Sequence, residues 1–289
     1  MVTHWIHDST KILYEMDMRE IKIASLFAGI GGFDLGITRA IDKTNDYTAR
    51  TIWQCEIDTY CQSILKRHWP HATLYPDIRT INPDTIEQPD IILSSFPCQD
   101  VSCAGKGEGI NGKNTGLYWH AHRLIKTIRP SIVIMENVPA ITWRGRGGID
   151  VIESLADIGY DAEWTIVSAQ SRGANHVRKR WFLVAYPADT ICKRTQIQTK
   201  GKQPSLKMSR GKSQKRRTTD DINHWQKGTT QPPICGMDDG VSGGLDRRTN
   251  RHRMNAIKAL GNAIVPQCAE YIGDCIVQSG LLNTITNKG

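Results

Sequence analysis

The residues whose types most directly suggest chemistry lie in "SSFPCQDVSC", residues 94–103, where two cysteines stand five positions apart. Cys98 lies between Pro97 and Gln99, and Cys103 follows on the same stretch. The pair could be a metal clip, half of a disulfide, or a nucleophile with a bystander. An exposed thiol at a turn near a helix start can have a lowered pKa, which makes it more reactive. The spacing alone leaves these interpretations open.

The remaining cysteines weaken two of these interpretations. No C-x-x-C pair occurs, and the spacings match no zinc pattern, so no metal site is predicted. In a reducing compartment most cysteines are buried as small apolar residues. The nucleophile interpretation therefore stays open. The eight cysteines are Cys55, Cys61, Cys98, Cys103, Cys192, Cys235, Cys268 and Cys275.

An acid and two arginines occur where they could assist a thiolate. "MENVPA" places Glu136 at the end of an expected strand, and "VRKRWFLV" places Arg178 and Arg180 two apart at the entrance of another. Side chains two apart on a strand point to the same face. A thiolate, a carboxylic acid and guanidiniums at one sheet edge suit covalent attack on an electron-poor ring. The acid would hydrogen-bond a ring nitrogen while an arginine holds a carbonyl or phosphate.

A glycine-rich stretch, "LFAGIGGFDLG" at 26–36, follows an expected strand and opens a helix. Such a loop suits a nucleotide or nucleoside cofactor, because glycine permits close backbone approach and a helix N-terminus favours polar groups. It is not a dinucleotide fingerprint, since position 34 is Asp, and it is not a phosphate-binding G-x-x-x-x-G-K loop. A purely structural turn is the alternative. Glu56, after the second expected strand, is placed to hold a ribose diol or to cap a surface helix.

Short β-branched runs alternate with helix-like segments and must position these groups. We expect strands over 21–27, 51–58, 90–96, 131–138, 161–169 and 181–186. Continuous apolar strands alternating with helices predict an α/β fold with a mostly parallel sheet covered by helices on both faces. Ligands of such folds bind at the carboxyl ends of the strands, where the Gly, Cys and Glu signals fall.

Composition favours an ordinary globular protein with a polyanionic partner. Of the 289 residues, 39% are hydrophobic and 23% charged, and the formal net charge is +8. No run of about 18 apolar residues is present, so no membrane association is expected. The start, "MVTHWIHDSTKILYEMDMRE", lacks the apolar core of a signal peptide, which predicts a cytoplasmic protein in a reducing compartment.

The chain changes character after Pro187. Residues 188–221 are rich in Lys and Arg with almost no apolar periodicity, which favours a flexible basic arm or minimal module over an independent core, although a solvated linker is the plain alternative. Helix-like periodicity returns in "RMNAIKALGNAIVPQCAEYIGDCIVQSGLL". We expect an N-terminal extension over 1–19, a catalytic and cofactor-binding domain over 20–186, a short basic region over 187–250, and a segment over 251–289 that rejoins the main domain.

Taken together, these motifs resemble those of the DNA (cytosine-5)-methyltransferase family. "FAGIGG" matches its cofactor loop, "FPCQ" its nucleophile motif, "ENV" its acid motif, "RKR" its arginine motif and "GNAIVP" its returning segment, in the family's order. The similarity covers nearly all of 20–186 and roughly 254–275. It implies a Rossmann-like, S-adenosylmethionine-dependent methyltransferase sheet with helices on both faces and a small basic target-recognition region.

The resemblance assigns roles to the reactive residues. Cys98 would attack C6 of a cytosine flipped out of double-stranded DNA, because chemistry on a stacked base is impossible. Glu136 would donate to N3, and Arg180 with Arg178 would hold O2 and the neighbouring phosphate. Cys103 has no role. The residues expected near the substrate are Pro97, Gln99, Ser102, Asn137 and His176.

For the cofactor, the resemblance implies stacking on Phe27, close approach to the glycine loop, and a ribose held by Glu56. Asp77 would bond the adenine amine, Leu117 would wall the methionine pocket, and Asn262 would close the site. The full expected set for S-adenosylmethionine is Phe27, Ala28, Gly29, Ile30, Gly31, Gly32, Glu56, Ile57, Asp77, Ile78, Leu117, Asn262 and Ala263.

Some features depart from the family. His176 occupies a position that is often Gln, and the recognition region between about Pro187 and Arg248 is short and basic, which predicts modest sequence selectivity and steep salt dependence. A transfer-RNA cytosine-5 methyltransferase of the same fold and a non-catalytic DNA-binding relative are the alternatives. A cognate restriction endonuclease is an allowed partner, and a monomer is expected.

Overall fold

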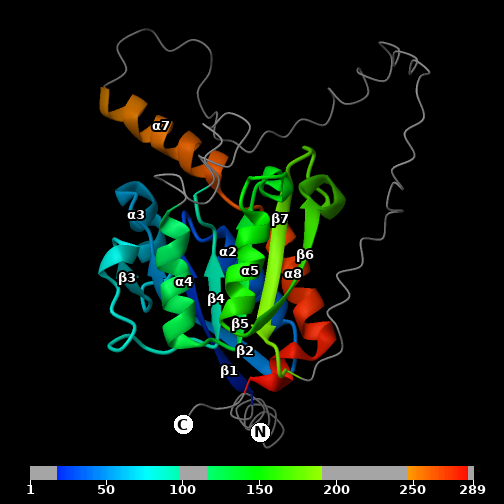
Figure 1. Ribbon diagram of the computed structural model, residues 1–289. Helices are drawn as coiled ribbons and strands as arrows, with labels where there is room; N and C mark the ends of the chain where they lie inside the picture. The colour runs from blue at the N-terminus through cyan, green and yellow to red at the C-terminus, as the bar shows by residue number, and fades with distance from the viewer. Residues whose placement is uncertain (1–17, 98–115, 191–246, 286–289) are drawn as a thin grey trace, which may run out of the picture. The chain divides into compact units, whose positions relative to one another are not determined.

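The computed structural model describes residues 18–97, 116–190 and 247–285, which include all of the expected strands. Its contacts divide the chain into one unit of residues 1–198 and 257–289 and another of residues 199–256. Of the second unit, only 247–256 are described, as the first part of helix α7 (Arg247–Asn262). The first unit is a seven-stranded sheet between two layers of helices (Figure 1).

The sheet has the strand order β3-β2-β1-β4-β5-β7-β6. The strands β3, β2, β1, β4 and β5 run parallel, and β7 is antiparallel to both of its neighbours. The carboxyl ends of the parallel strands and the start of β7 therefore share one edge, at the top of Figure 1. The strands are β1 Arg19–Leu26, β2 Tyr47–Cys55, β3 Thr73–Tyr75, β4 Ile91–Ser94, β5 Ile132–Asn137, β6 Tyr160–Ser168 and β7 Lys179–Pro187.

One face of the sheet packs on α4 (Leu117–Ile128) and α5 (Gly148–Asp157). Tyr118 and Leu124 of α4 and Leu155 of α5 are fully buried there against strand residues such as Ile92 and Val133. The strands are apolar toward both faces, as a sheet covered on both sides requires. Helix α3 (Thr59–His68), the turn η1 (Ile78–Thr80) and the turn η3 (Pro139–Thr142) complete this part of the chain.

The opposite face packs on α2 (Gly32–Asp42) and α8 (Pro266–Ser279), followed by η5 (Leu281–Thr284). The α8 helix thus brings the end of the chain back against the helix that follows the glycine loop. Gly36 permits the close approach, since a Cβ there would lie 2.4 Å from the carbonyl oxygen of Pro266 and 2.5 Å from Cβ of Ala269.

The α/β class and the mostly parallel sheet are confirmed, and two details differ from the expectation. The pattern gave no strand at β3, a three-residue edge strand that is held by pairing with β2. It also gave no sign that β7 would insert between β5 and β6. That insertion is a long-range pairing, and local periodicity does not encode which strands become neighbours.

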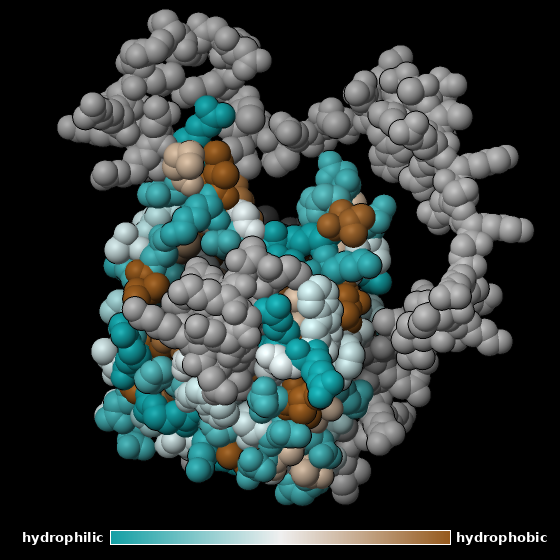
Figure 2. Space-filling model, turned by 45° about the horizontal axis from the view of Figure 1, so that its top comes forward, coloured by the Kyte–Doolittle hydropathy of each residue, from teal (hydrophilic) through white to brown (hydrophobic). Residues whose placement is uncertain are grey.

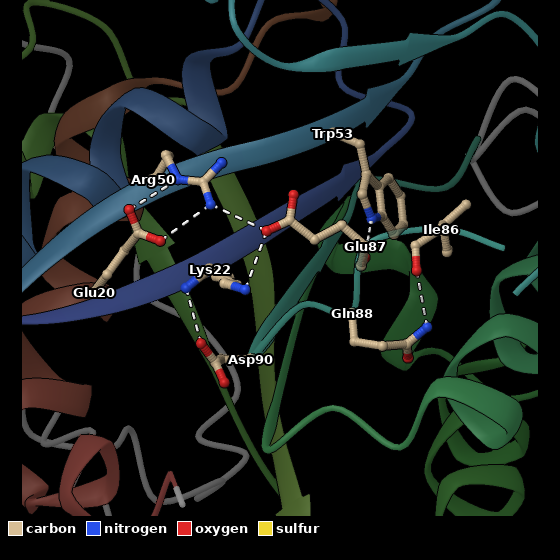
Figure 3. A network of polar contacts seen from close by, with 8 residues as sticks. All are labelled: Glu20, Lys22, Arg50, Trp53, Ile86, Glu87, Gln88 and Asp90. Carbon is tan, nitrogen blue, oxygen red and sulfur yellow. Dashed lines mark hydrogen bonds and ion pairs between the residues drawn. The ribbon is translucent and has the colours of Figure 1, made fainter. Parts of the chain in front are cut away.

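A polar network lies near the amino ends of β1 and β2, away from the edge described above (Figure 3). Arg50 contacts Glu20 at 2.8 Å and Glu87 at 3.0 Å, and Lys22 lies 3.1 Å from Glu87. The Trp53 indole donates to the backbone oxygen of Glu87 at 2.9 Å. These half-exposed ion pairs contribute little stability individually, but together they fix the chain as it enters β4.

Among the described residues, no helix combines the length and apolar character needed to cross a membrane.

We predict that Gly36→Ala lowers stability by about 1–3 kcal/mol, because the added methyl overpacks the contact between α2 and α8. Thermal or denaturant unfolding would measure the change. Gly261→Ala is the matched control, since a Cβ at Gly261 meets nothing within 4 Å and alanine favours a helix. An unchanged midpoint for Gly36→Ala would show that the two helices do not depend on this contact.

Candidate active site

The predicted site residues that are described gather at the edge where β1, β2, β4 and β5 end and β7 begins. The glycine loop follows β1, Glu56 follows β2, Pro97 lies beyond β4, and Glu136 lies near the end of β5. Cys98, Gln99, Ser102 and Cys103 lie outside the described residues. The ends of the parallel strands and the start of the antiparallel β7 therefore place at one edge groups that are as far apart in sequence as Phe27 and Arg180.

Glu136 and Arg180 form a buried ion pair at this edge. The Arg180 Nε lies 2.8 Å from Oε1 of Glu136, and the two side chains are only 20% and 10% exposed. The register explains the meeting, because Glu136 pairs with Phe182 of β7 and Arg180 lies two residues before Phe182 on the same face. The strand alternation thus places both groups on the side of α2 and α8.

Burial makes Glu136 an unusual carboxyl. Its removal from water raises the pKa to about 7 from an ordinary 4.5, while the positive charges of Arg180 and Arg178 oppose that rise. Desolvation outweighs the ion pair here, because the carboxyl is almost completely enclosed. A neutral acid can still accept the Arg180 hydrogen bond on one oxygen and present an O–H on the other. Glu136 is therefore suited to donate a proton near neutral pH.

Asn137 ties the end of β5 to the chain that leads to Cys98. Its Nδ2 donates to the backbone oxygen of Phe96 at 3.2 Å, and its Oδ1 accepts from the backbone N–H of Val138 at 2.8 Å. Phe96 is buried, and Pro97 follows it. Phe96, two residues before Cys98, is therefore anchored beside the strand that carries Glu136.

The described cysteines do not compete for the role of nucleophile. Cys55, Cys61 and Cys268 are buried free thiols, and Cys275 is half-buried. Burial raises the pKa of Cys55 and of Cys61 to about 12 in each case. Thiols that stay protonated in apolar surroundings are poor nucleophiles.

Arg178 binds the returning segment through its guanidinium group. One guanidinium nitrogen donates to the backbone oxygen of Gly261 at 2.8 Å, and the other donates to that of Ala263 at 2.9 Å. Carbonyls at a helix C-terminus lack intrahelical partners, and a guanidinium satisfies them with a favourable charge. Arg178 thus caps the end of α7, and its positive charge also opposes the rise in the pKa of Glu136.

The glycine loop is held from both sides. Gly32 lies so close to the returning segment that a Cβ would come within 2.5 Å of the Ile264 oxygen. Gly31, with φ +82°, would bring a Cβ to 2.3 Å from the Trp69 ring. Phe27 takes a left-handed conformation, with φ 58°, which is rare for an aromatic residue and is a common sign of a functional turn.

Glu56 lies directly against the loop. Its carboxylate accepts from the backbone N–H of Gly29 and from that of Asp58, each at 2.8 Å. The N-cap of α3 is Asp58 and not Glu56, because the Asp58 side chain accepts from the N–H groups of Tyr60 and Cys61. These two bonds orient the Glu56 carboxylate, and each of its oxygens can still accept another hydrogen bond, as a pair of hydroxyls would require.

A nucleoside cofactor fits the groups around Glu56. Ile57 is 69% exposed, which is apolar surface that a purine could cover. Asp77 is half-buried, and its carboxylate accepts from the backbone N–H and guanidinium of Arg79 at 2.9 Å. Phe27 and Leu117 are half-buried against the core on the α4 and α5 face. Ile78 is buried in the core cluster against which both side chains pack.

The remaining expected residues are more exposed. Asn262 ends α7 on the surface, Ala263 is half-buried, and His176 is exposed just before Arg178. Within the described ranges no cluster of three or more His, Cys, Asp or Glu side chains could hold a metal ion.

One buried group was missed by the sequence interpretation. Asp34 in the first turn of α2 is fully buried and accepts from the Gln54 amide at 3.0 Å. Burial raises its pKa, and hydrogen bonds from Gln54, Ser25 and Thr51 oppose the rise. This contact ties the helix after the glycine loop to β2, whose end leads to Glu56. The sequence signal that could have identified Asp34 is its place as an acidic residue in the first turn of the expected helix.

Figure 2 turns the site edge toward the viewer, and hydrophilic residues cover most of the described surface there, with hydrophobic ones in small scattered groups.

Residues 21–232 match the family described as C-5 cytosine-specific DNA methylase. This match spans most of the sequence, and the chain belongs to that family.

Curated relatives agree with the family assignment. The chain is 31% identical over 188 residues to the Type II methyltransferase M.Sau3AI of Staphylococcus aureus, covering 60% of this chain and 45% of that protein. It is 32% identical over 171 residues to the Type II methyltransferase M2.BsuMI of Bacillus subtilis strain 168, covering 57% and 42%. The matched part thus spans about half the length of these relatives.

The fold is also similar to a solved structure. A prophage-encoded protein of E. coli, assigned as a DNA modification methyltransferase, superposes with a TM-score of 0.58 at 18% identity, covering 91% of this chain and 99% of that one. At this identity the likeness supports the Rossmann-like fold alone.

We predict that Arg178→Lys loosens the returning segment, because lysine keeps the charge but cannot span two carbonyls. Hydrogen–deuterium exchange should become faster at 260–266, where the Ala263 N–H is bonded to the Ala259 oxygen. Lys179→Ala, a change at the exposed neighbour, should leave the exchange unaltered. Equal exchange in the wild type and in Arg178→Lys would contradict a locking role for Arg178.

Proposed function

We propose that the protein transfers a methyl group from S-adenosylmethionine to C5 of a cytosine in DNA. The observation that best supports this is a buried carboxyl, Glu136, whose pKa of about 7 lets it hold a proton beside Arg180. It lies at the sheet edge where Pro97 leads into Cys98. A thiol and a proton donor at one edge are what addition to a pyrimidine ring requires.

Cys98 would act as the nucleophile. Its thiolate forms a bond to C6, and the electrons displaced from the C5–C6 double bond move toward N3. Glu136 gives its proton to N3, so the ring carries no full negative charge. Arg180 would hold O2 by a hydrogen bond. These contacts make C5 nucleophilic, and the preorganised donors act where charge develops.

When bound, S-adenosylmethionine supplies the electrophilic methyl group. A base then removes the proton from C5, the C6–S bond breaks, and Cys98 leaves as a thiolate. Glu136 recovers the N3 proton in the same stage.

The cofactor would be held by residues around the glycine loop. Glu56, oriented by the N–H groups of Gly29 and Asp58, would accept from the ribose hydroxyls. Phe27, Ile57 and Ile78 would contact the adenine, and Asp77 its amine. The close packing of Gly32 on the Ile264 oxygen would keep the methionine side of the pocket closed.

The target cytosine would have to leave the duplex, because C6 and C5 are not accessible in the stacked base. Gln99 and Ser102, which lie outside the described residues, are proposed to cover the extruded base. The named relatives are Type II methyltransferases, so we propose a cognate restriction endonuclease as a functional partner. We also propose that the enzyme is a monomer and acts in the cytoplasm.

Bisulfite sequencing of DNA from cells that express the protein would test the activity and reveal the target site together. The wild type should protect a defined set of cytosines, and Cys98→Ser should protect none while it still binds S-adenosylmethionine. Cys103→Ser is the matched control and should retain activity. Methyl transfer to transfer RNA but not to duplex DNA in a parallel assay would overturn the proposed substrate.

The pH dependence of kcat/KM should report Glu136. Its raised pKa keeps the carboxyl protonated up to about 7, so the rate should fall as the pH rises through that value. In Glu136→Gln the remaining activity should be much lower and should lack this falling limb. A wild-type profile without a fall between pH 6 and 9 would contradict the role of Glu136 as an acid.

A further inference from the structure

Two connections at the site edge carry positive charge without a carboxylate. One follows β5 over 139–149, "PAITWRGRGGI", and the other precedes β7 over 169–179, "AQSRGANHVRK". The first carboxylate after the first connection is Asp150, at the start of α5. The basic residues of the two connections are Arg144, Arg146, Arg172, Arg178 and Lys179.

The two connections are neighbours in the fold. The turn η3 of the first one packs against β7, and the second, which contains η4 (Ala169–Arg172), ends where β7 begins. The N–H of Ala169 donates to the oxygen of Arg178 at 2.9 Å, so the second connection closes on itself beside β7. The first connection follows β5 and the second precedes β7, and the register of these two strands places Glu136 opposite Phe182. They therefore flank the buried acid, at the top of Figure 1.

The first connection is a turn with defined internal contacts, and Trp143 and Arg144 are exposed on it. Ile141 is fully buried and anchors it. The N–H of Trp143 donates to the Ala140 oxygen at 3.0 Å, and the N–H of Arg146 donates to the Trp143 oxygen at 3.0 Å. Gly148 packs so tightly that a Cβ would lie 2.6 Å from the Ile141 oxygen. The turn therefore holds Trp143 in a defined place.

Trp143 is 55% exposed, although it is among the largest apolar side chains of the protein. Arg144 beside it is also exposed. Single exposed apolar residues are common, but an exposed tryptophan with an adjacent arginine on a connection without carboxylates has a more specific chemistry. Aromatic rings stack on bases and sugars, and guanidiniums bind phosphate.

We propose that the turn Trp143–Arg146 binds the DNA strand that flanks the target cytosine, with Arg144 on a phosphate and Trp143 stacked on a sugar or base. This surface rests on the proposed function and adds to it a DNA contact outside the basic region 187–250. It positions the duplex beside Glu136 from the side of β5 and β7.

The test combines binding and catalysis for Arg144→Ala and Trp143→Ala in the full-length protein. A fluorescent duplex oligonucleotide pool, titrated at several salt concentrations, gives the affinity and its salt slope. Arg144→Ala should reduce that slope by about one and weaken binding. Trp143→Ala should weaken binding by about 5- to 150-fold, the range for losing one stacked base. The KM for unmethylated genomic DNA should rise in parallel, with the affinity for S-adenosylmethionine unchanged.

Two controls separate a local contact from general effects. Arg39→Ala removes an exposed charge from the last turn of α2, near the opposite edge of the sheet, where β2 begins. Trp164→Ala removes a 49% exposed tryptophan from the middle of β6. Both should bind DNA like the wild type. If the wild type methylates DNA but Arg144→Ala and Trp143→Ala behave like the controls, the turn is not a DNA contact and the proposed function stands. If the wild type neither binds nor methylates DNA, both proposals fail.

Discussion

The burial of one carboxyl organises the edge of the sheet that carries the candidate active site. Glu136 is enclosed on β5 and contacted by Arg180 from β7, and this arrangement is possible only because β7 inserts antiparallel beside β5. A parallel neighbour would have brought its carboxyl end, and not its basic entrance, to the same edge. The register thus creates both the enclosure that raises the pKa and the arginine that orients the acid.

The returning segment completes this edge through close backbone contacts. Gly32 and Gly36 let the chain after α7 approach α2 to a distance that no side chain would permit. Arg178 binds the other side of the same segment through two carbonyls. The glycine loop and the arginine motif are therefore coupled through residues 261–266, although they are far apart in sequence. A substitution within residues 261–266 should therefore alter the packing of both the glycine loop and the arginine motif.

Much of this arrangement could be predicted from the sequence, because continuous apolar runs and glycine, acid and arginine motifs are local patterns. The class of fold, the return of the C-terminal segment and the gathering of Phe27, Glu56 and Glu136 at one edge follow from them. Strand β3 and the insertion of β7 depend on long-range pairing, which local patterns do not carry. The two-carbonyl contact of Arg178 and the burial of Asp34 likewise need the packed structure to be seen.

The protonation state of Glu136 is the most direct test of the account. Carbon-13 NMR of side-chain-labelled glutamate, with the signal assigned by its absence in Glu136→Gln, would follow the carboxyl through a pH titration. A midpoint near 7 is expected for an acid that burial keeps protonated. A midpoint near the ordinary 4.5 would mean that Glu136 is an anion paired with Arg180 at neutral pH, and the proton donor would have to be sought elsewhere.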